Sequence, residues 1–466
     1  MKFWVAVASF VPAVALMFMD QTILPVALPA IQSELGATDT ELQWCVNAYI
    51  LAIAMFLLVS GKLGDRIGLR KTFSFGMAGF VLSSMLCGMS QSIAWLIWMR
   101  ALQGVSAALM MPPQQAIMRY VFPASSLGRG IGCTVSIGSI FLMIAPVIGG
   151  YLTDVLSWRW IFWINAPIGV VGLWIVLTYW PSPKPIKNPI DLYGFLSFAT
   201  GIGLLTLFFM QVTEWGWTST ISFSCLGLAL VFLFLLILRE RKALHPFLDL
   251  ALFKRPLFAA INLSISTAQT FLMVSVFWLI YFQDILHYTS FEAGLLSFVS
   301  GFPLLFVSPL AGLLSDRFGP KLPLALGYLL LLYTSFFLAF VPLPSLAGLL
   351  IALFTFGMGM PMLFTPSFAT AMTSIPSNKS GIAMGTIITI RMVAASIGLA
   401  CMHLLTSTVY TKKLSSLGER GANIASFSTL HLALGFLIVI NFAITFVLHS
   451  RKSTHHLPEF PGEGWD

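Results

Sequence analysis

Apolar segments of about 20 residues recur along the whole chain, and they limit what it can fold into. A helix needs about 20 predominantly apolar residues to cross the hydrocarbon core of a bilayer. Of the 466 residues, 58% are hydrophobic and only 9% are charged, whereas a soluble domain carries about 25% charged residues. Because so few polar side chains are available to cover a water-soluble core, the segments are predicted to lie in lipid.

Fourteen such segments can be drawn between short polar connections, which leave no room for a sizeable soluble domain. The sequence therefore predicts an all-α polytopic membrane protein with 14 transmembrane helices. The predicted spans are 4–28, 43–62, 73–90, 93–113, 130–152, 160–180, 193–212, 219–238, 257–283, 291–313, 322–341, 345–365, 382–405 and 430–449.

Basic residues are concentrated in alternate connections. The loops on the side of the N-terminus, together with the chain ends, contain 19 of the 25 Lys and Arg residues, and the opposite side contains four. Cytoplasmic loops of membrane proteins carry an excess of Lys and Arg, so both termini are predicted to be cytoplasmic. The net charge of +8 is then a topology signal, and no nucleic-acid partner is expected.

A loop rich in glycine and charge occurs twice, as Gly61-Lys-Leu-Gly-Asp-Arg-Ile-Gly68 between spans two and three and as Gly312-Leu-Leu-Ser-Asp-Arg-Phe-Gly319 between spans ten and eleven. If spans seven and eight are an insertion, both copies occupy the same place in a six-span half. The duplication therefore predicts a six-helix bundle at 1–180, a linker with two inserted spans at 181–255, and a second bundle with a short cytoplasmic tail at 256–466.

Other motifs accompany this repeat: Asp20 to Pro29 in span one, Arg100-Ala-Leu-Gln-Gly in span four and Gly138 to Gly150 in span five. Together they resemble the major facilitator superfamily, specifically its fourteen-span drug:proton antiporter branch. Pro25, Leu142 and Ala145 depart from the branch's usual motifs. The resemblance implies the major facilitator fold, with two halves around a midplane site.

The resemblance also implies roles for two groups of residues. The repeated loop is expected to latch one conformation. The alternative, a solvated basic loop, explains its charge but not the glycine-aspartate pattern that occurs twice. The residues of this gating loop are Gly61, Asp65, Arg66, Gly68, Arg70, Asp316 and Arg317. The antiporter motif is formed by Gly138, Pro146, Gly149 and Gly150, for which ordinary close helix packing is the alternative.

Asp20 is the one carboxylate that falls deep inside an apolar stretch. Charges inside a membrane are costly and therefore usually functional. Burial disfavours the charged form of a carboxyl group, so Asp20 is predicted to exchange a proton during transport. The alternative is that span one ends near Met19 and Asp20 caps it at the interface. Asp20 and Arg100 each lie about 10–12 Å below the outer surface, so the two are expected to pair and couple transport to protons.

Two further polar residues, Gln103 and Arg391, are candidates for a substrate cavity. Arg391 falls in the inner half of span thirteen, where binding a substrate and locking helices together are equally compatible with the sequence. The cysteines show neither metal spacing nor a disulfide framework, and no metal site or cofactor is expected. The proton motive force would drive transport.

The predicted function is export of a small lipophilic compound, a cation being one option, in exchange for protons. An alternative is export of a metabolite, a siderophore or an organic anion, with Arg100 or Arg391 binding the negative charge. A membrane enzyme or sensor is a remote alternative, because the chain shows no paired catalytic carboxylates and no soluble input domain. We expect a monomer in the cell inner membrane, and the sequence leaves open whether a periplasmic adaptor protein joins it.

Overall fold

The computed structural model describes residues 3–122, 127–185, 191–241, 253–374 and 380–450, which form helices joined by short connections. The tail predicted after residue 450 and the linker residues 186–190 and 242–252 lie outside the described residues. The helices are α1 (Phe3–Ile23), the 3-10 helix η1 (Leu24–Ala27), α2 (Leu28–Leu35), α3 (Asp39–Ile67), α4 (Leu69–Gly88), α5 (Ile93–Val121), α6 (Leu127–Val155), α7 (Trp160–Trp163), α8 (Asn165–Tyr179), α9 (Leu192–Trp215), α10 (Thr220–Glu240), α11 (Pro256–Asp284), α12 (Ser290–Gly301), α13 (Leu304–Phe318), α14 (Lys321–Phe340), α15 (Leu346–Ser374) and α16 (Ser380–Ser450).

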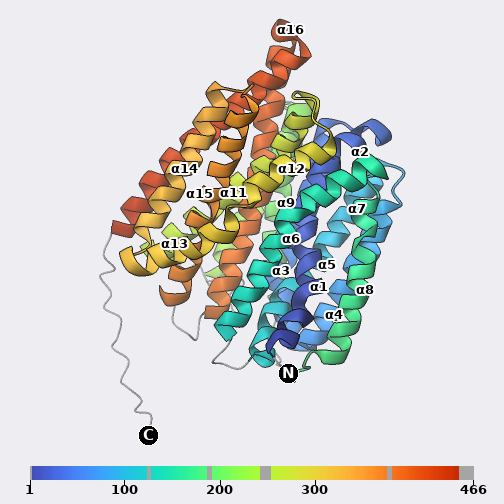
Figure 1. The fold of residues 1–466 in the computed structure, drawn as a ribbon, viewed down its shortest axis with the longest axis vertical. Helices are drawn as coiled ribbons and strands as arrows, with labels where there is room; N and C mark the ends of the chain where they lie inside the picture. The colour runs from blue at the N-terminus through green and yellow to red at the C-terminus, as the bar shows by residue number, and fades with distance from the viewer. Residues whose placement is uncertain (1–2, 123–126, 186–190, 242–252, 375–379, 451–466) are drawn as a thin grey trace.

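Two bundles of helices stand side by side (Figure 1). Helices α1 to α8, blue to green at the right, form the first bundle, and helices α11 to α16, yellow to red at the left, form the second. In the first bundle α5 packs along both α3 and α4, and in the second α11 packs along α16 and α14 along α15. The bundles meet along two seams, one between α6 and α12 and the other between α3 and α16.

Helices α9 and α10 pack on each other and stand beside the α3–α16 seam. An apolar cluster joins Leu51 of α3, Phe198 and Ile202 of α9, and Ile397 of α16. The predicted inserted pair of spans therefore contacts both bundles along one seam. On the outside of α10, large apolar side chains such as Phe234 are exposed.

Twelve helices in the described part of the chain are long and apolar enough to cross a membrane. The sequence predicts fourteen, and two helices account for the difference. Helix α4 is not among the twelve, because Arg70 and Lys71 in its first turn, together with several Ser, Thr and Gly residues, lower its mean hydropathy. Helix α16 runs continuously through the last two predicted spans, although its backbone is not helical at Gly418 (φ 69°, ψ 176°). An all-α multi-pass bundle is established, and the number fourteen stays a prediction.

The two ends of α16 nevertheless run beside each other on either side of Gly418. The hydroxyl of Ser426 donates a hydrogen bond to the carbonyl oxygen of Thr406 at 3.2 Å. Residues 20 positions apart in one straight helix would be separated by about 30 Å. The chain therefore reverses direction near Gly418, at the projecting tip labelled α16 in Figure 1.

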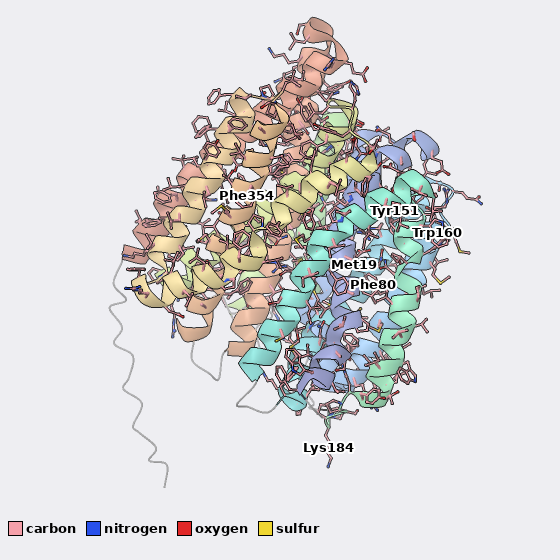
Figure 2. The ribbon with its side chains drawn as sticks, viewed as in Figure 1. Met19, Phe80, Tyr151, Trp160, Lys184 and Phe354 are labelled. Atoms are coloured by element: carbon pink, nitrogen blue, oxygen red, sulfur yellow. The ribbon has the colours of Figure 1, made fainter. Side chains whose placement is uncertain are left out.

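Large apolar side chains cover the outside of the bundles. Trp98 is 72% exposed and Phe340 is 74% exposed. Contiguous apolar surface of this kind marks an interaction with lipid or another apolar partner, which fits a protein that crosses a bilayer. Lys184 extends from the end of the molecule at which the N-terminus lies (Figure 2).

Candidate functional site

The first apolar stretch is broken by two proline-containing turns. Helix α1 ends at Ile23, one turn of 3-10 helix follows, and α2 begins at Leu28. Pro25 and Pro29 lie in the first turns of η1 and α2, where the missing N–H of proline is tolerated. Asp20 lies one turn before the break, within α1, and is 2% exposed. It is a buried residue of the helix and not an interfacial cap.

Arg100 of α5 reaches Asp20 across the first bundle. Its Nη1 atom lies 2.8 Å from Asp20 Oδ2 and 2.7 Å from Gln103 Oε1, and its Nε donates to the carbonyl oxygen of Cys45 at 3.2 Å. Gln103 Nε2 donates to Asp20 Oδ1 at 3.0 Å. Both carboxylate oxygens of Asp20 therefore accept a hydrogen bond. The predicted pairing of Asp20 with Arg100 is confirmed, and its role in proton coupling stays a prediction.

Aromatic rings enclose the Arg100 guanidinium, which is centred 4.2 Å from the ring of Tyr49 and 5.9 Å from that of Phe162. A cation is attracted to the face of an aromatic ring. At the 2.8 Å separation between Arg100 and Asp20, Coulomb attraction amounts to about 6 kcal/mol with an effective dielectric constant of about 20. Because Asp20 and Arg100 are only 2% and 1% exposed, bulk water does not screen this attraction, and the two side chains form a neutral buried unit.

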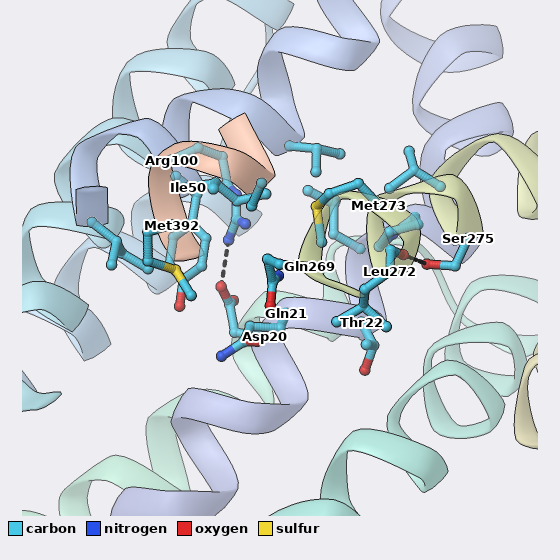
Figure 3. Close-up of a pocket in the computed structure, with 17 residues that line it drawn as sticks. Asp20, Gln21, Thr22, Ile50, Arg100, Gln269, Leu272, Met273, Ser275 and Met392 are labelled. Atoms are coloured by element: carbon cyan, nitrogen blue, oxygen red, sulfur yellow. Dashed lines mark hydrogen bonds and ion pairs between the residues drawn. The ribbon is translucent and has the colours of Figure 1, made fainter. Parts of the chain in front are cut away.

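A small cavity lies between the bundles beside this pair (Figure 3). Its lining comes from α1, η1, α3 and α5 of the first bundle and from α11 and α16 of the second. The space that can hold the centres of water-sized molecules is about 30 Å³, and one water needs about 10–15 Å³ on this measure. The cavity can therefore hold a few waters at most, and the bundles must separate before an organic compound fits.

The two predicted cavity residues, Gln103 and Arg391, do not line this cavity. Gln103 is fully buried behind the ion pair, whereas Arg391 lies one helical turn before Ala395, which does line the cavity. Tyr49 and Gln269 are among the lining residues that the sequence did not identify. The Oε1 atom of Gln269 is buried and has no hydrogen-bond partner among the described residues. A glutamine in the middle of an apolar span is the signal that identifies Gln269.

The two copies of the glycine-rich loop have similar backbone forms. Gly68 separates α3 from α4 with a φ of 106°, and Gly319 follows α13 with a φ of 77°. Residues with a side chain rarely adopt such angles, so both turns require glycine. Arg70 Nη1 donates to the carbonyl oxygen of Trp180 at 3.1 Å, at the C-terminal end of α8. A cation is favourable at this end of a helix, so Arg70 joins the start of α4 to the end of α8.

The other predicted residues of the loop lie at the ends of helices. Asp65 and Arg66 are in the last turn of α3, and Asp316 and Arg317 are in the last turn of α13. Arg66 and Arg317 are exposed, and the Arg317 guanidinium lies 5.3 Å from the ring centre of Phe318. Gly61 lies in the interior of α3. The latch role of these residues stays a prediction.

Small residues of α6 allow close contact at the seam with α12. A Cβ atom added to Gly150 would collide with the carbonyl oxygen of Ser290, and one added to Gly294 of α12 would collide with the carbonyl oxygen of Pro146. The two helix backbones therefore touch along this line. Glycine at positions 150 and 294 is needed for the bundles to approach to this distance.

The same helix also packs closely on α1. A Cβ atom at Gly149 would lie 2.7 Å from Cγ1 of Ile23, and one at Gly138 would lie 2.9 Å from the ring of Phe18. Separations under 3 Å are too short for a carbon contact, so both positions require a residue without a side chain. The four residues of the predicted antiporter motif thus lie where α6 meets α1 and α12.

Several hydrogen bonds join the two bundles, all at the end of the molecule opposite the N-terminus, which is called the distal end below. Their partners on α3 lie in its first third, and Asp154 lies in the last turn of α6. These contacts close the distal end. They are Asn47 Nδ2 to Ser396 O (3.2 Å), Ser396 Oγ to Asn47 Oδ1 (2.7 Å), Thr40 Oγ1 with His403 Nε2 (3.1 Å), Gln283 Nε2 to Val26 O (3.0 Å) and Phe291 N to Asp154 Oδ2 (2.8 Å).

A family profile described as the Major Facilitator Superfamily matches residues 10–399. The chain belongs to the major facilitator superfamily. It is therefore a multi-pass secondary transporter with a small-molecule substrate, and not an enzyme.

Three relatives within the superfamily have informative names. The multidrug resistance protein Stp of Mycobacterium tuberculosis is 32% identical, covering 83% of this chain and 73% of Stp. The tetracenomycin C resistance and export protein of Streptomyces glaucescens is 29% identical, covering 86% and 76% respectively. The riboflavin transporter RibZ of Clostridioides difficile is 30% identical, covering 89% and 91%. Two of the three names concern drug resistance.

Solved structures of superfamily members share the fold. The crystal structure of the peptide transporter POT in complex with sulfate superimposes with a TM-score of 0.68 over 95% of this chain and 94% of that chain. The two sequences are 16% identical, so this likeness concerns the fold alone.

Proposed function

We propose that this transporter exports small lipophilic organic compounds in exchange for protons and that Asp20 and Arg100 couple the two movements. The observation that carries the proposal is the buried ion pair, which lies beside the cavity between the bundles. The names of Stp and of the tetracenomycin C protein support the direction and the class of cargo.

A proton that reaches Asp20 would convert the neutral pair into a single buried cation. The Coulomb attraction of about 6 kcal/mol between the two side chains would then be lost, and Arg100 would need a new partner. A buried cation without a partner is costly, so protonation favours a rearrangement around α1 and α5. Because Asp20 lies one turn from the break at η1, such a rearrangement would act directly on the contacts at the distal end.

In transport by alternating access, the protein opens first to one side of the membrane and then to the other. The contacts between the bundles at the distal end would hold the protein in one of these two states. With the N-terminus in the cytoplasm, the distal end is the outer face, and this structure represents a state closed to the outside. Release of cargo would then require the hydrogen bonds of the distal end to open and the α6–α12 backbone contact to separate. The loops at Gly68 and Gly319, at the opposite end, would close as the distal end opens.

We further propose fourteen membrane spans, with both termini in the cytoplasm and the two inserted spans at α9 and α10. Helix α4 is 20 residues long and packs along α5, and α16 reverses near Gly418. Counting α4, and counting α16 twice, brings twelve candidate spans to fourteen. The boundaries 1–180, 181–255 and 256–466 then separate the two halves from the insertion, in the cell inner membrane.

Export of a metabolite is the second candidate function. It is favoured by RibZ, which aligns over most of both chains and is named as a riboflavin transporter. The cavity itself does not separate the two functions, since its lining combines apolar side chains with Gln21, Thr22 and Gln269.

Transport in everted membrane vesicles tests the leading proposal. An imposed pH gradient, acidic inside, should drive accumulation of a lipophilic fluorescent ion, tested with ethidium as the cation and 1-anilinonaphthalene-8-sulfonate as the anion. Adding the transported ion should release protons from the vesicle interior. Asp20→Asn should abolish both movements while the protein is still inserted in the membrane. Glu419→Gln, which removes an exposed acid near the tip of α16 that takes no part in the seam contacts, serves as the matched control and should retain proton coupling.

Two results would count against the proposal. Proton release that persists in Asp20→Asn would place the proton site elsewhere. If the vesicles ignore both ions but exchange riboflavin for protons, the cargo is a metabolite and the coupling mechanism stands.

A further inference from the structure

Arg391 is a second arginine deep within the membrane region. It lies in α16, and it follows the first residue of that helix, Ser380, by 11 residues, which corresponds to about 17 Å along the helix. Ala395 and Met392 line the cavity between the bundles. Because residues four apart share a face of a helix and long side chains lean toward the helix N-terminus, Arg391 lies next to the cavity, on the side away from the distal end.

The Arg391 guanidinium has no anionic partner among the described residues. Its Nε atom is buried and makes no hydrogen bond. Its one recorded contact is with an aromatic ring, that of Phe364 on α15, whose centre lies 5.8 Å away. A buried donor without an acceptor is unfavourable, and so is a charge in a membrane without a counterion. The Arg391 guanidinium is therefore a buried cation that an anionic partner would stabilise.

Arg100, the other arginine within the membrane region, differs from Arg391 in its partners. Arg100 is neutralised by Asp20, and its hydrogen bonds go to Asp20, Gln103 and Cys45. It cannot bind an anion without giving up a carboxylate that is already in place. Arg391 has a free donor and an uncompensated charge at about one helical turn from the cavity. The electrostatic environment of the cavity in the second bundle is therefore suited to a negative group.

We propose that Arg391 binds an anionic group, a carboxylate or a phosphate, on the compound that the protein exports. This proposal rests on the export function proposed above and assigns its substrate class. A guanidinium presents paired N–H donors that match carboxylate and phosphate oxygens. The apolar surroundings, which include Phe364, would hold the organic part of the same compound.

A buried hydroxyl near Phe364 adds a second donor. Ser367 lies three residues after Phe364, on the same face of α15. It is 1% exposed, and its Oγ has no hydrogen-bond partner. Phe364 also packs in an apolar cluster with Ile261 of α11 and Ile387 of α16, so the three helices converge at this depth. An anion between α15 and α16 would satisfy groups that now lack partners.

Equilibrium binding of two matched compounds tests the proposal. The probes are 2-naphthoate and 2-naphthamide, which share the ring system and differ in charge, measured by isothermal titration with the whole chain in phosphatidylcholine nanodiscs. The wild type should bind the carboxylate at least tenfold more tightly than the amide. Arg391→Gln should remove that preference and leave amide binding within twofold. Arg391→Lys should keep part of it, and Ser367→Ala should weaken carboxylate binding about threefold.

Arg119→Gln is the matched control, because Arg119 is exposed near the end of α5 and its removal changes the net charge equally. It should leave both affinities unchanged. If the wild type fails to bind 2-naphthoate or does not prefer it, the proposal is wrong. It is also wrong if Arg391→Gln keeps the preference while eluting as a folded monodisperse protein, because Arg391 then only joins helices.

Nanodiscs containing one third phosphatidylglycerol distinguish the source of the anion. If a lipid headgroup supplies it, naphthoate affinity of the wild type should fall about tenfold in these discs, whereas that of Arg391→Gln should not change. Equal affinities in both lipids assign the site to a free compound. No pH gradient is used, so failure of proton coupling in vesicles would leave this result intact, and loss of the anion preference would leave the coupling result intact.

Discussion

Asp20→Asn should destabilise the protein as well as uncouple it. The substitution preserves the shape of the side chain but replaces one carboxylate oxygen with an NH₂ group. Both oxygens now accept hydrogen bonds, from Arg100 Nη1 and from Gln103 Nε2, so the new NH₂ must face a donor. Arg100 would also remain buried at 1% exposure without a counterion. Removing one partner of a buried pair costs about 3–5 kcal/mol.

A double-mutant cycle measures this coupling in detergent micelles by reversible unfolding with sodium dodecyl sulfate. Asp20→Asn and Arg100→Gln should each lower the free energy of unfolding by about 3–5 kcal/mol. The double variant contains neither charge, so it should be less destabilised than the sum of the single variants by about 2–3 kcal/mol. Asp154→Asn, at the exposed distal end, should cost about 1 kcal/mol or less.

The reasoning fails if Asp20→Asn unfolds within about 1 kcal/mol of the wild type, since a buried unpaired guanidinium costs more than that. It also fails if the two single effects add without coupling, because the ion pair would then contribute nothing beyond its separate side chains.

Three further substitutions test the closed seam and the repeated loop. Gly150→Leu should abolish export without preventing membrane insertion, because its side chain would collide with Ser290 O. A membrane-impermeant maleimide added outside should then label a cysteine placed in the cavity more rapidly than it does in the same protein with Gly150. An unchanged labelling rate would contradict the proposed closure. Gly68→Ala should lower the free energy of unfolding by about 1–3 kcal/mol, because the φ of Gly68 is 106°. Gly61→Ala should change the free energy of unfolding by less than half as much, because an added Cβ atom would lie at an ordinary 3.6 Å from Cβ of Pro112. Arg70→Gln should lower the free energy of unfolding by about 1 kcal/mol, because the hydrogen bond to the end of α8 is lost. Arg70→Lys should lower it by less. If both variants are equally destabilised, Arg70 makes no directed hydrogen bond of importance there.

Much of the fold follows from properties that act locally along the chain. Apolar length and the distribution of basic residues predict helices and their order without knowledge of packing. The two helices that separate twelve candidate spans from fourteen are the ones where this signal weakens. Helix α4 contains many small polar residues, and α16 continues on both sides of Gly418 with helical backbone.

The sequence predicts one part of the site, the pairing of Asp20 with Arg100, from the depth of the two residues in the membrane. Asp20 and Arg100 were paired by counting residues from the same membrane surface, which works because the rise along a helix is constant. Counting gives depth and not rotation about the helix axis. For this reason it did not reveal that Gln103 points behind the pair, nor that Gln269 of the second bundle faces the cavity. Those facts depend on how α5 and α11 pack against their neighbours.

The position of α9 makes the two sides of this transporter unequal toward the surrounding bilayer. Helix α9 packs on both α3 and α16 and so covers the seam between them, whereas the main contacts of α9 and α10 include neither α6 nor α12. A compound dissolved among the lipid tails would therefore meet α9 at the first seam and not at the second. If the two halves move against each other during transport as proposed, α9 must slide against either α3 or α16, and the apolar contacts of Phe198 and Ile202 would have to rearrange.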